Sequence, residues 1–282
     1  FIKHKKILRF FIGDIRDLER LELATKNIDF VFHAAAMKHV PIAEYNPMEA
    51  IKTNILGSQN LIFACIKNNV KNVMALSTDK AVNPVNLYGS TKLAADKLFI
   101  AANNLSGKNG TKFSVVRYGN VLGSRGSVIP LFKKLSENKS NKLPITHTEM
   151  SRFFIAIEEA ISFVLAMFNE MKGGEIFVPK IPSVHITELA NAIAPYNKQK
   201  ITGIRPGEKI SEVLISEEES MYTYETKNHY VILPIILNNA KFSNLVKKYK
   251  KVKLNFKYTS ANNKKFLNKN EIISKCKKFN LF

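Results

Sequence analysis

The segment from residue 77 to residue 92 holds the side chains best suited to proton transfer. Asp79 and Lys80 place an acid next to a base, and Tyr88 and Lys92 lie four residues apart. Residues at this spacing share one face of a helix, and a nearby ammonium favours the ionised form of a phenol. These four side chains could therefore supply both the general acid and the general bases of a reaction.

A strand and a helix must hold these residues in place. Residues 73–76 form an apolar run that predicts a buried parallel strand, and residues 88–103 predict a helix. In open α/β sheets, ligands bind outside the carboxyl ends of the strands. The candidate residues follow such a strand directly, at the edge where this kind of fold does its chemistry.

The remaining elements alternate between strand and helix along the chain. This alternation predicts an α/β fold in which helices cover a Rossmann-type parallel sheet, with a smaller substrate-binding domain. We expect the sheet domain at residues 1–122 and 151–180, and the smaller part at 123–150 and 181–282; residues 239–282, rich in Lys and Asn, are the hardest to interpret. Further strands are predicted at residues 9–13, 28–35, 113–118, 175–178 and 230–233, and further helices at 46–65, 156–170 and 186–194.

The composition of the 282 residues limits the function classes. A hydrophobic fraction of 45% provides for a substantial core, and no apolar run approaches the ~18 residues of a membrane span. Two cysteines give no disulfide framework, so we expect a cytoplasmic protein. The net charge of +20 could indicate nucleic-acid binding, but the lysines are spread along the chain, which favours a solvated basic surface. No metal site is indicated.

Five blocks of sequence resemble the UDP-N-acetylglucosamine 4,6-dehydratases of the extended short-chain dehydrogenase/reductase superfamily. The similarity is closest to the soluble, C5-inverting enzymes that open the pseudaminic acid pathway of flagellin glycosylation. It covers nearly all of residues 7–235 in the same order. The blocks are residues 33–41, 44–47, 77–92, 117–127 and 203–209.

The resemblance implies a reaction in three stages. C4 of the sugar is oxidised by a bound nicotinamide, NADP rather than NAD in this group; water is lost across C5–C6; and the hydride returns to C6. Tyr88, assisted by Lys92, would be the base for O4, Asp79 the acid for O6 and Lys80 the base for C5. Asp79 must then be buried enough to stay protonated, and desolvation must lower the pKa of Lys80. Thr78 would bind and orient the sugar hydroxyl.

Two of these residues narrow the subgroup. Many C5-retaining sugar-nucleotide dehydratases have Asp-Glu where this chain has Asp79 and Lys80. Membrane-bound retaining relatives often have methionine where this chain has Tyr88. The resemblance therefore favours C5 inversion.

The resemblance also implies binding residues. For the cofactor they are Asp14 and Ile15 at the adenine, the closely approached Ala34, Ala35 and Ala36, and Lys38, Tyr88 and Lys92. For UDP-N-acetylglucosamine they are Lys38 and His39 beside the sugar, and Asn120, Arg152, Arg205 and Glu208 at the uridine and pyrophosphate. The family further implies a homo-oligomer, from dimer to hexamer, and no nucleic acid or membrane as partner.

A glycine-rich phosphate-binding loop is absent near the start of the sequence. We therefore expect that an N-terminal segment is missing and that the chain by itself binds NADP poorly, because such a loop supplies backbone N–H groups to the pyrophosphate. Three alternatives stay open: a C5-retaining dehydratase or 4-epimerase, a truncated non-catalytic remnant, and a basic nucleic-acid-binding protein.

Overall fold

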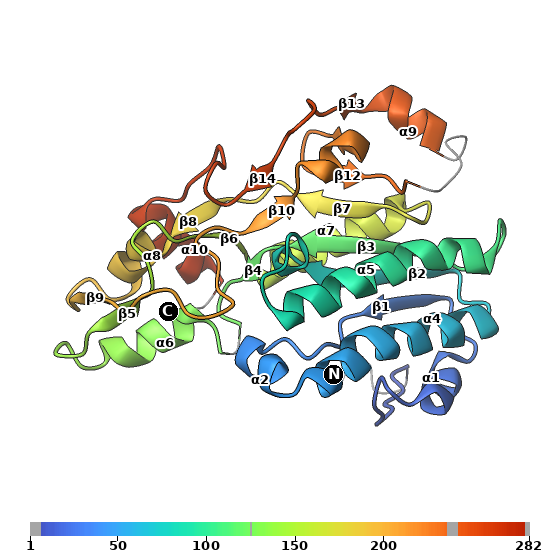
Figure 1. Cartoon of the computed structure of the whole chain (residues 1–282), viewed down its shortest axis with the longest axis horizontal. Coiled ribbons are helices and arrows are strands. Elements are labelled where there is room, and N and C mark those ends of the chain that lie inside the picture. Colours follow the sequence, from blue (N-terminus) through green and yellow to red (C-terminus); the bar gives the residue numbers. More distant parts are fainter. Residues whose placement is uncertain (1–6, 125, 236–241, 280–282) are drawn as a thin grey trace.

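The computed structural model of the chain describes residues 7–124, 126–235 and 242–279. Within these ranges the largest sheet has seven strands in the order β1-β2-β3-β7-β12-β11-β13 (Figure 1). Strands β1, β2, β3 and β7 are parallel, whereas β12, β11 and β13 continue the sheet in antiparallel pairs. The parallel half confirms the predicted α/β class. The strands are β1 Phe30–His33, β2 Asn72–Thr78, β3 Lys112–Tyr118, β7 Ile176–Pro179, β11 Thr223–Glu225, β12 His229–Ile232 and β13 Lys250–Lys251.

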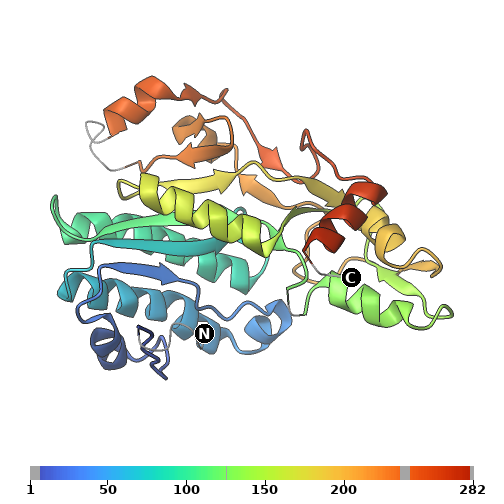
Figure 2. The same ribbon diagram turned by 180° about the vertical axis from the view of Figure 1, so that it is seen from behind.

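Helices cover both faces of this sheet. Helices α4 (Gly57–Lys67) and α5 (Leu87–Ser106) lie on one face (Figure 1), and α7 (Ile157–Glu170) lies on the other (Figure 2). Helix α5 begins where the side chain of Asn86 accepts a hydrogen bond from the backbone N–H of Gly89, 2.8 Å away, and it ends at Gly107, whose φ is 72°. None of the helices in the described ranges is both long and apolar enough to cross a membrane.

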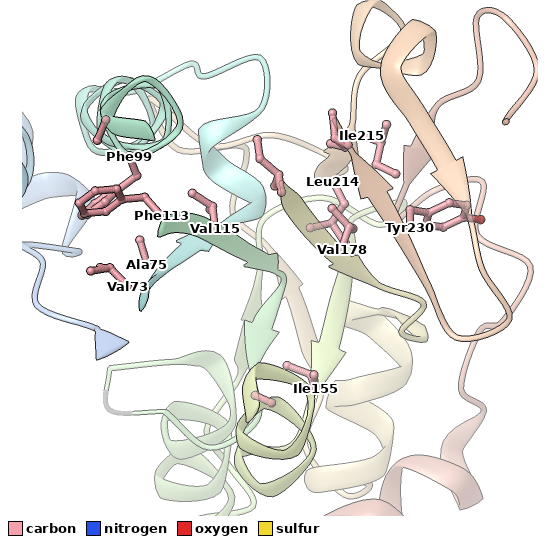
Figure 3. Close-up of a cluster of buried hydrophobic side chains, with 14 of the residues drawn as sticks. Val73, Ala75, Phe99, Phe113, Val115, Ile155, Val178, Leu214, Ile215 and Tyr230 are labelled. Carbon is pink, nitrogen blue, oxygen red and sulfur yellow. The ribbon is translucent and has the colours of Figure 1, made fainter. Parts of the chain in front are cut away.

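One hydrophobic core joins the parallel strands to the C-terminal half of the chain. Figure 3 shows Val73 and Val115 of the sheet near Phe99 of α5, with Leu214 and Tyr230 farther along the same cluster. Burial of each such side chain stabilises the fold by about 1.5–3 kcal/mol. The parallel strands and the C-terminal half of the chain therefore stabilise each other, and this packing fixes the C-terminal strands relative to β2.

The smaller elements form a second packed region beside the carboxyl ends of the parallel strands (Figure 1). Its strands are β4 (Asn120–Val121), β6 (Ser151–Ile155) and β8 (Ser183–His185) in one sheet, and β5 (Leu143–Ile145) with β9 (Gln199–Ile201). The pair of β10 (Val213–Ile215) and β14 (Tyr258–Thr259) packs instead in the core of the main sheet, through Leu214, Ile215 and Tyr258. The remaining helices are α1 (Leu18–Thr25), α2 (Val40–Tyr45), α3 (Pro47–Ile51), α6 (Val128–Ser136), α8 (Ile186–Ile193), α9 (Ser243–Lys248) and α10 (Lys269–Lys278).

The sheets do not follow the predicted division of the chain. Strands β11, β12 and β13 come from residues 181–282, which we expected in the smaller part, yet they extend the main sheet. Strand β6 comes from residues 151–180, which we expected in the sheet domain, yet it pairs with β4 and β8. Of the segment 239–282, residues 242–279 form α9, β13, β14 and α10, and the others lie outside the described residues.

The predicted strand at residues 9–13 is wrong: the segment is irregular. A strand needs a neighbour to complete its hydrogen-bond ladder, and within the described ranges no strand pairs with this segment. Arg20 of α1 holds it instead. Its Nε donates to the carbonyl oxygen of Ile12 at 2.7 Å, and its guanidinium lies 4.9 Å from the ring centroid of Phe11. The Arg20 side chain thus provides a hydrogen-bond partner for a backbone carbonyl that would pair with a neighbouring strand in a sheet.

The predicted helix at 46–65 is present but not uniform. It starts at Asn46-Pro47 as expected, and it then contains a π-helical segment, Lys52–Leu56, between α3 and α4. Such segments are frequent at functional sites because they redirect a side chain.

Candidate active site

Thr78, Asp79 and Lys80 form a tight turn at the carboxyl end of β2. The Thr78 hydroxyl accepts a hydrogen bond from the Lys80 backbone N–H at 3.4 Å and donates one to Asp79 Oδ1 at 3.0 Å. This geometry turns the Asp79 carboxyl inward, where it is fully buried. Lys80 Nζ donates to the same Oδ1 at 3.0 Å, while Asp79 Oδ2 has no hydrogen-bond partner within the described ranges. Oδ1 of Asp79 thus stabilises the turn, and Oδ2 remains able to hydrogen-bond to a ligand.

Burial and charge act differently on this acid and this base. Burial raises the pKa of Asp79, although the Lys80 ammonium opposes the shift. This agrees with the protonated carboxyl that an acid requires. Burial also lowers the pKa of Lys80, but the carboxylates of Asp79 and Glu212 outweigh it, and the net pKa of Lys80 is raised. The expectation of a lowered Lys80 pKa is therefore wrong for this arrangement, because two anions lie close to the ammonium.

Tyr88 and Lys92 occupy one face of the first turns of α5, and both are nearly buried. Burial raises the pKa of Tyr88 to about 12, and the charge that opposes this shift comes chiefly from Lys80. Lys92 Nζ instead donates to the carbonyl oxygen of Leu76 at 2.9 Å. Burial lowers the pKa of Lys92, and the charge of Asp96 opposes this. Lys80 is therefore a cation that favours the Tyr88 phenolate, and the assistance expected from Lys92 stays a prediction.

The loop after β1 packs against Tyr88. Met37 and Val40 join the hydrophobic cluster that contains Tyr88, so the intervening Lys38 and His39 lie on a loop held beside α5. Asn54 of the π-helical segment fixes this loop by accepting from the Met37 backbone N–H at 2.8 Å and donating to its carbonyl oxygen at 2.9 Å. Asn54 was not predicted from the sequence, where nothing indicates the π-helical segment that contains it.

Four of the six predicted substrate residues line a cavity of about 330 Å³ beside this turn, whereas Lys38 and His39 are not among its lining residues. Three of its lining residues carry a buried polar atom without a hydrogen-bond partner in the described part of the chain: Asn120 Oδ1, Ser127 Oγ and Glu212 Oε2. Buried polar atoms are nearly always paired, so such a concentration indicates a site for a polar ligand. The lining includes Lys80, Asn120, Arg152, Arg205 and Glu208 from the predicted set, and also Ser127, Lys209 and Glu212, whose place at the site was not predicted from the sequence.

Arg152 is the buried cation of this cavity, with a side chain 8% exposed. Its Nη1 donates to the carbonyl oxygens of Ser151 and Ile210 at 2.8 and 3.0 Å, and its Nε lies 3.8 Å from Glu212 Oε1. Glu208 lies 3.9 Å from Arg152, while Arg205 is exposed at the rim. The cavity therefore offers one buried guanidinium, which lies near two carboxylates, and one exposed guanidinium, and both groups can bind the oxygens of an anionic ligand such as a phosphate.

The predicted adenine contacts do not line this cavity. Arg16 beside Asp14 donates to its carboxylate and lowers the pKa of that group to about 2. Arg16 also pairs with Glu49 of α3. Ile15 packs so closely on Gly57, at the start of α4, that an added Cβ would lie 2.7 Å from Ile15 Cγ2. Their role at a cofactor stays a prediction.

Comparisons with known proteins show which family the chain resembles. The model of the family described as "Polysaccharide biosynthesis protein" matches residues 2–234. The UDP-N-acetylglucosamine 4,6-dehydratase (inverting) of Campylobacter jejuni subsp. jejuni serotype O:23/36 (strain 81-176) is 56% identical over 96% of this chain and 83% of its own length. The UDP-glucose 4-epimerase of Rickettsia canadensis is 44% identical over 94% of this chain and 78% of its own length.

A solved structure shows the same fold. The X-ray structure of Pen from Bacillus thuringiensis superposes with a TM-score of 0.87 at 37% identity, covering 100% of this chain and 84% of that one. The match of the family model to most of the chain, together with these identities, establishes the relationship. The chain belongs to the polysaccharide biosynthesis proteins and, within them, to the family of the inverting UDP-N-acetylglucosamine 4,6-dehydratases.

Proposed function

We propose that the protein removes water from UDP-N-acetylglucosamine across C5–C6, giving a UDP-4-keto-6-deoxy sugar. The observation that carries this proposal is the contact between Asp79 and Lys80 in the turn after β2. Exchange of configuration at C4 needs a proton acceptor only at O4. Loss of water needs, in addition, a base at C5 and an acid at O6, and this chain has a base and an acid in contact beside the cavity.

The residues present fit a nicotinamide cofactor at the carboxyl edge of the sheet. Ala34, Ala35 and Ala36 follow β1 and are exposed, so a flat ring could approach the backbone closely. Tyr88 and Lys92 lie on the neighbouring helix. A nicotinamide held there would supply the hydride acceptor for C4 and the hydride donor for C6.

The side chains of this chain manage the protons. Tyr88 takes the proton of O4 as the C4 ketone forms, and the ketone makes the C5 proton acidic. Lys80, as a free amine, takes the proton from C5 while Asp79 gives a proton to O6, so that the C6–O6 bond breaks and water leaves. Lys80 Nζ donates a hydrogen bond of 3.0 Å to Asp79 Oδ1. Transfer of one proton along this bond would produce both the Lys80 amine and the protonated Asp79 that the step needs.

The cavity would hold the UDP portion. Arg152 and Arg205 suit the diphosphate, because guanidinium groups match phosphate oxygens in geometry and charge. Asn120 and Glu208 would bind the uridine, and Thr78, Lys38 and His39 would contact the sugar. These assignments rest on the shared cavity, on the unpartnered Asn120 Oδ1, and on the packing of the 37–40 loop against Tyr88.

The finer features of the proposal extend what is known of the relatives. The Campylobacter jejuni relatives carry the name "inverting", and we assign C5 inversion to this chain as well. We further propose NADP rather than NAD as the cofactor, a cytoplasmic homo-oligomer as the working form, and a product that enters pseudaminic acid synthesis for flagellin glycosylation.

The test is product analysis by NMR after incubation with UDP-N-acetylglucosamine in D2O. NADP is supplied in large excess, because a chain without the glycine-rich loop is expected to bind it weakly. We expect a C6 methyl signal, deuterium at C5 and an inverted C5 configuration. Lys80→Ala should lower kcat by about 10²–10⁴-fold, as loss of a general base does, whereas Lys97→Ala, on the exposed side of α5, should match the wild type. A C4 epimer as sole product, or normal turnover by Lys80→Ala, would refute the proposal.

A further inference from the structure

A carboxylate outside the predicted catalytic set lies among the cations of the cavity. Glu212 directly precedes β10, and its side chain is only 4% exposed. Glu212 Oε1 lies 3.4 Å from Lys80 Nζ and 3.8 Å from Arg152 Nε, and Oε2 lies 3.8 Å from Lys209 Nζ. Oε2 has no hydrogen-bond partner within the described residues. A buried carboxylate in this position acts mainly through its charge.

The backbone of Glu212 is fixed by the C-terminal part of the chain. Its N–H donates to Ser260 Oγ at 2.9 Å, and its carbonyl oxygen accepts from the Ser260 N–H at 2.8 Å. Ser260 Oγ also lies 3.1 Å from the carbonyl oxygen of Ser151, next to Arg152. Ser260 thus holds the backbone of Glu212 and the backbone of Ser151, the residue before Arg152. The two fixed backbones keep the Glu212 side chain near Lys80.

The charges around Lys80 come from several elements. The turn after β2 contributes Asp79, β6 contributes Arg152, and α5 contributes the phenol of Tyr88. The segment before β10 contributes Glu208, Lys209 and Glu212, and Lys209 is itself tied by a hydrogen bond of 2.7 Å to the carbonyl oxygen of Val82. The group contains three cations and three carboxyls: Lys80, Arg152 and Lys209 against Asp79, Glu208 and Glu212.

We propose that Glu212 is a positioning residue for Lys80: its carboxylate holds the Lys80 Nζ beside Asp79 and keeps it an ammonium at neutral pH. The proposal deepens the function proposed above and, for its kinetic consequence, rests on it. The direction of the Lys80 pKa agrees, since the charge of Glu212 is among the causes that raise it. If the carboxylate becomes an amide, Lys80 should lose its proton at a lower pH.

The test measures the protonation of Lys80 without using activity. Trace acetic anhydride acetylates only the free amine, so the yield at Lys80, followed by mass spectrometry across a pH series, gives its midpoint. In the wild type we expect a midpoint above the ~10.4 of free lysine. Glu212→Gln should lower it by about one unit or more, as expected for loss of an opposite charge within 4–6 Å. Glu217→Gln removes an equal charge from an exposed pair with Lys257 and should leave the midpoint unchanged.

A second variant protects the test against misfolding. Glu212→Asp keeps the charge, so its midpoint should stay near that of the wild type. The proposal is overturned if Glu212→Gln and the wild type share one midpoint. It is also overturned if the wild-type midpoint lies at or below that of free lysine, a measurement that needs no variant.

Kinetics separate this inference from the proposed function. In the proposed mechanism the pair of Asp79 and Lys80 reacts with one proton shared between its two members, so the alkaline limb of the pH profile of kcat reports the loss of that proton. Glu212→Gln should shift the alkaline limb to lower pH, whereas Glu217→Gln should not. A limb that stays in place overturns the proposal. A wild-type chain that does not dehydrate UDP-N-acetylglucosamine would refute the proposed function, while the acetylation midpoints would still decide the role of Glu212.

Discussion

Protonation of His33 is expected to destabilise the fold as the pH falls below about 6.5. His33 ends β1 and is 4% exposed, with its ring centroid 5.4 Å from that of Phe99. Burial, assisted by the charge of Lys92, lowers the pKa of His33 to about 3. In the unfolded chain the same group titrates near ~6.5. Between these two values the unfolded chain binds a proton that the folded chain does not.

The sign and size follow from this difference. Because the folded pKa is lowered, the stabilising contribution is fully present above about pH 6.5 and is lost as the pH falls toward the folded value. At about pH 5, proton linkage gives a loss of about 2 kcal/mol in the free energy of unfolding. His229, whose pKa burial lowers to about 4, adds a loss of similar size. The wild type should therefore lose about 4 kcal/mol from these two groups.

The assay is urea unfolding of the wild type and of His33→Phe at about pH 7.5 and about pH 5. Phenylalanine keeps a ring against Phe99 but does not titrate. The difference between the two pH values should shrink by about 2 kcal/mol in the variant, and any change in packing cancels because it is present at both. His229→Phe should produce a similar reduction. If His33→Phe retains the full wild-type pH dependence, His33 does not stay neutral in the folded chain.

Two further predictions concern buried polar contacts. Arg117→Met should lower the free energy of unfolding by about 3–5 kcal/mol, because the carboxylate of Asp96, 2% exposed, loses the guanidinium that lies 3.5 Å away. Urea unfolding measures this loss, and adding Asp96→Asn to the Arg117→Met chain should recover part of it. A loss below about 1 kcal/mol would contradict the assigned pairing. Asn54→Ala should lower the free energy of unfolding by about 1–3 kcal/mol, since the backbone N–H and carbonyl oxygen of Met37 both lose their partner. It should also lower kcat/KM for dehydration. An unchanged melting temperature and unchanged kinetics would show that the loop after β1 keeps its conformation without Asn54.

The parts of the site that sequence predicts are those fixed by neighbours in the chain. The turn of Thr78, Asp79 and Lys80 needs only a strand end and three adjacent residues, and the pair of Tyr88 and Lys92 needs only the helical period. The apolar runs of β2 and β3 and the Asn46-Pro47 helix start are equally local signals. Such features depend on residues close in sequence and not on contacts with distant parts of the chain.

The parts that sequence missed depend on distant residues. Residues 9–13 read as a strand, but strand formation depends on a neighbour, and Arg20 satisfies the segment instead. The contact between Lys80 and Glu212 joins residues 132 positions apart in numbering (212 − 80), and nothing in either local pattern points to the other. The resulting rise in the Lys80 pKa could not be predicted from burial alone.

The opposing needs of the acid–base pair explain why one additional carboxylate has consequences for the proposed reaction. Burial favours the uncharged pair, a protonated Asp79 with an amine at Lys80, because neither group then carries charge away from water. Glu212 favours the charged Lys80 and so works against the state that the reaction requires, while it also restrains the position of the Nζ atom. Glu212→Gln separates these two effects. If positioning dominates, kcat on the plateau of the pH profile falls; if charge dominates, the plateau persists and only the alkaline limb moves to lower pH. A combined result, with a lower plateau and a shifted limb, is what a fixed carboxylate 3.4 Å from the Lys80 ammonium should produce.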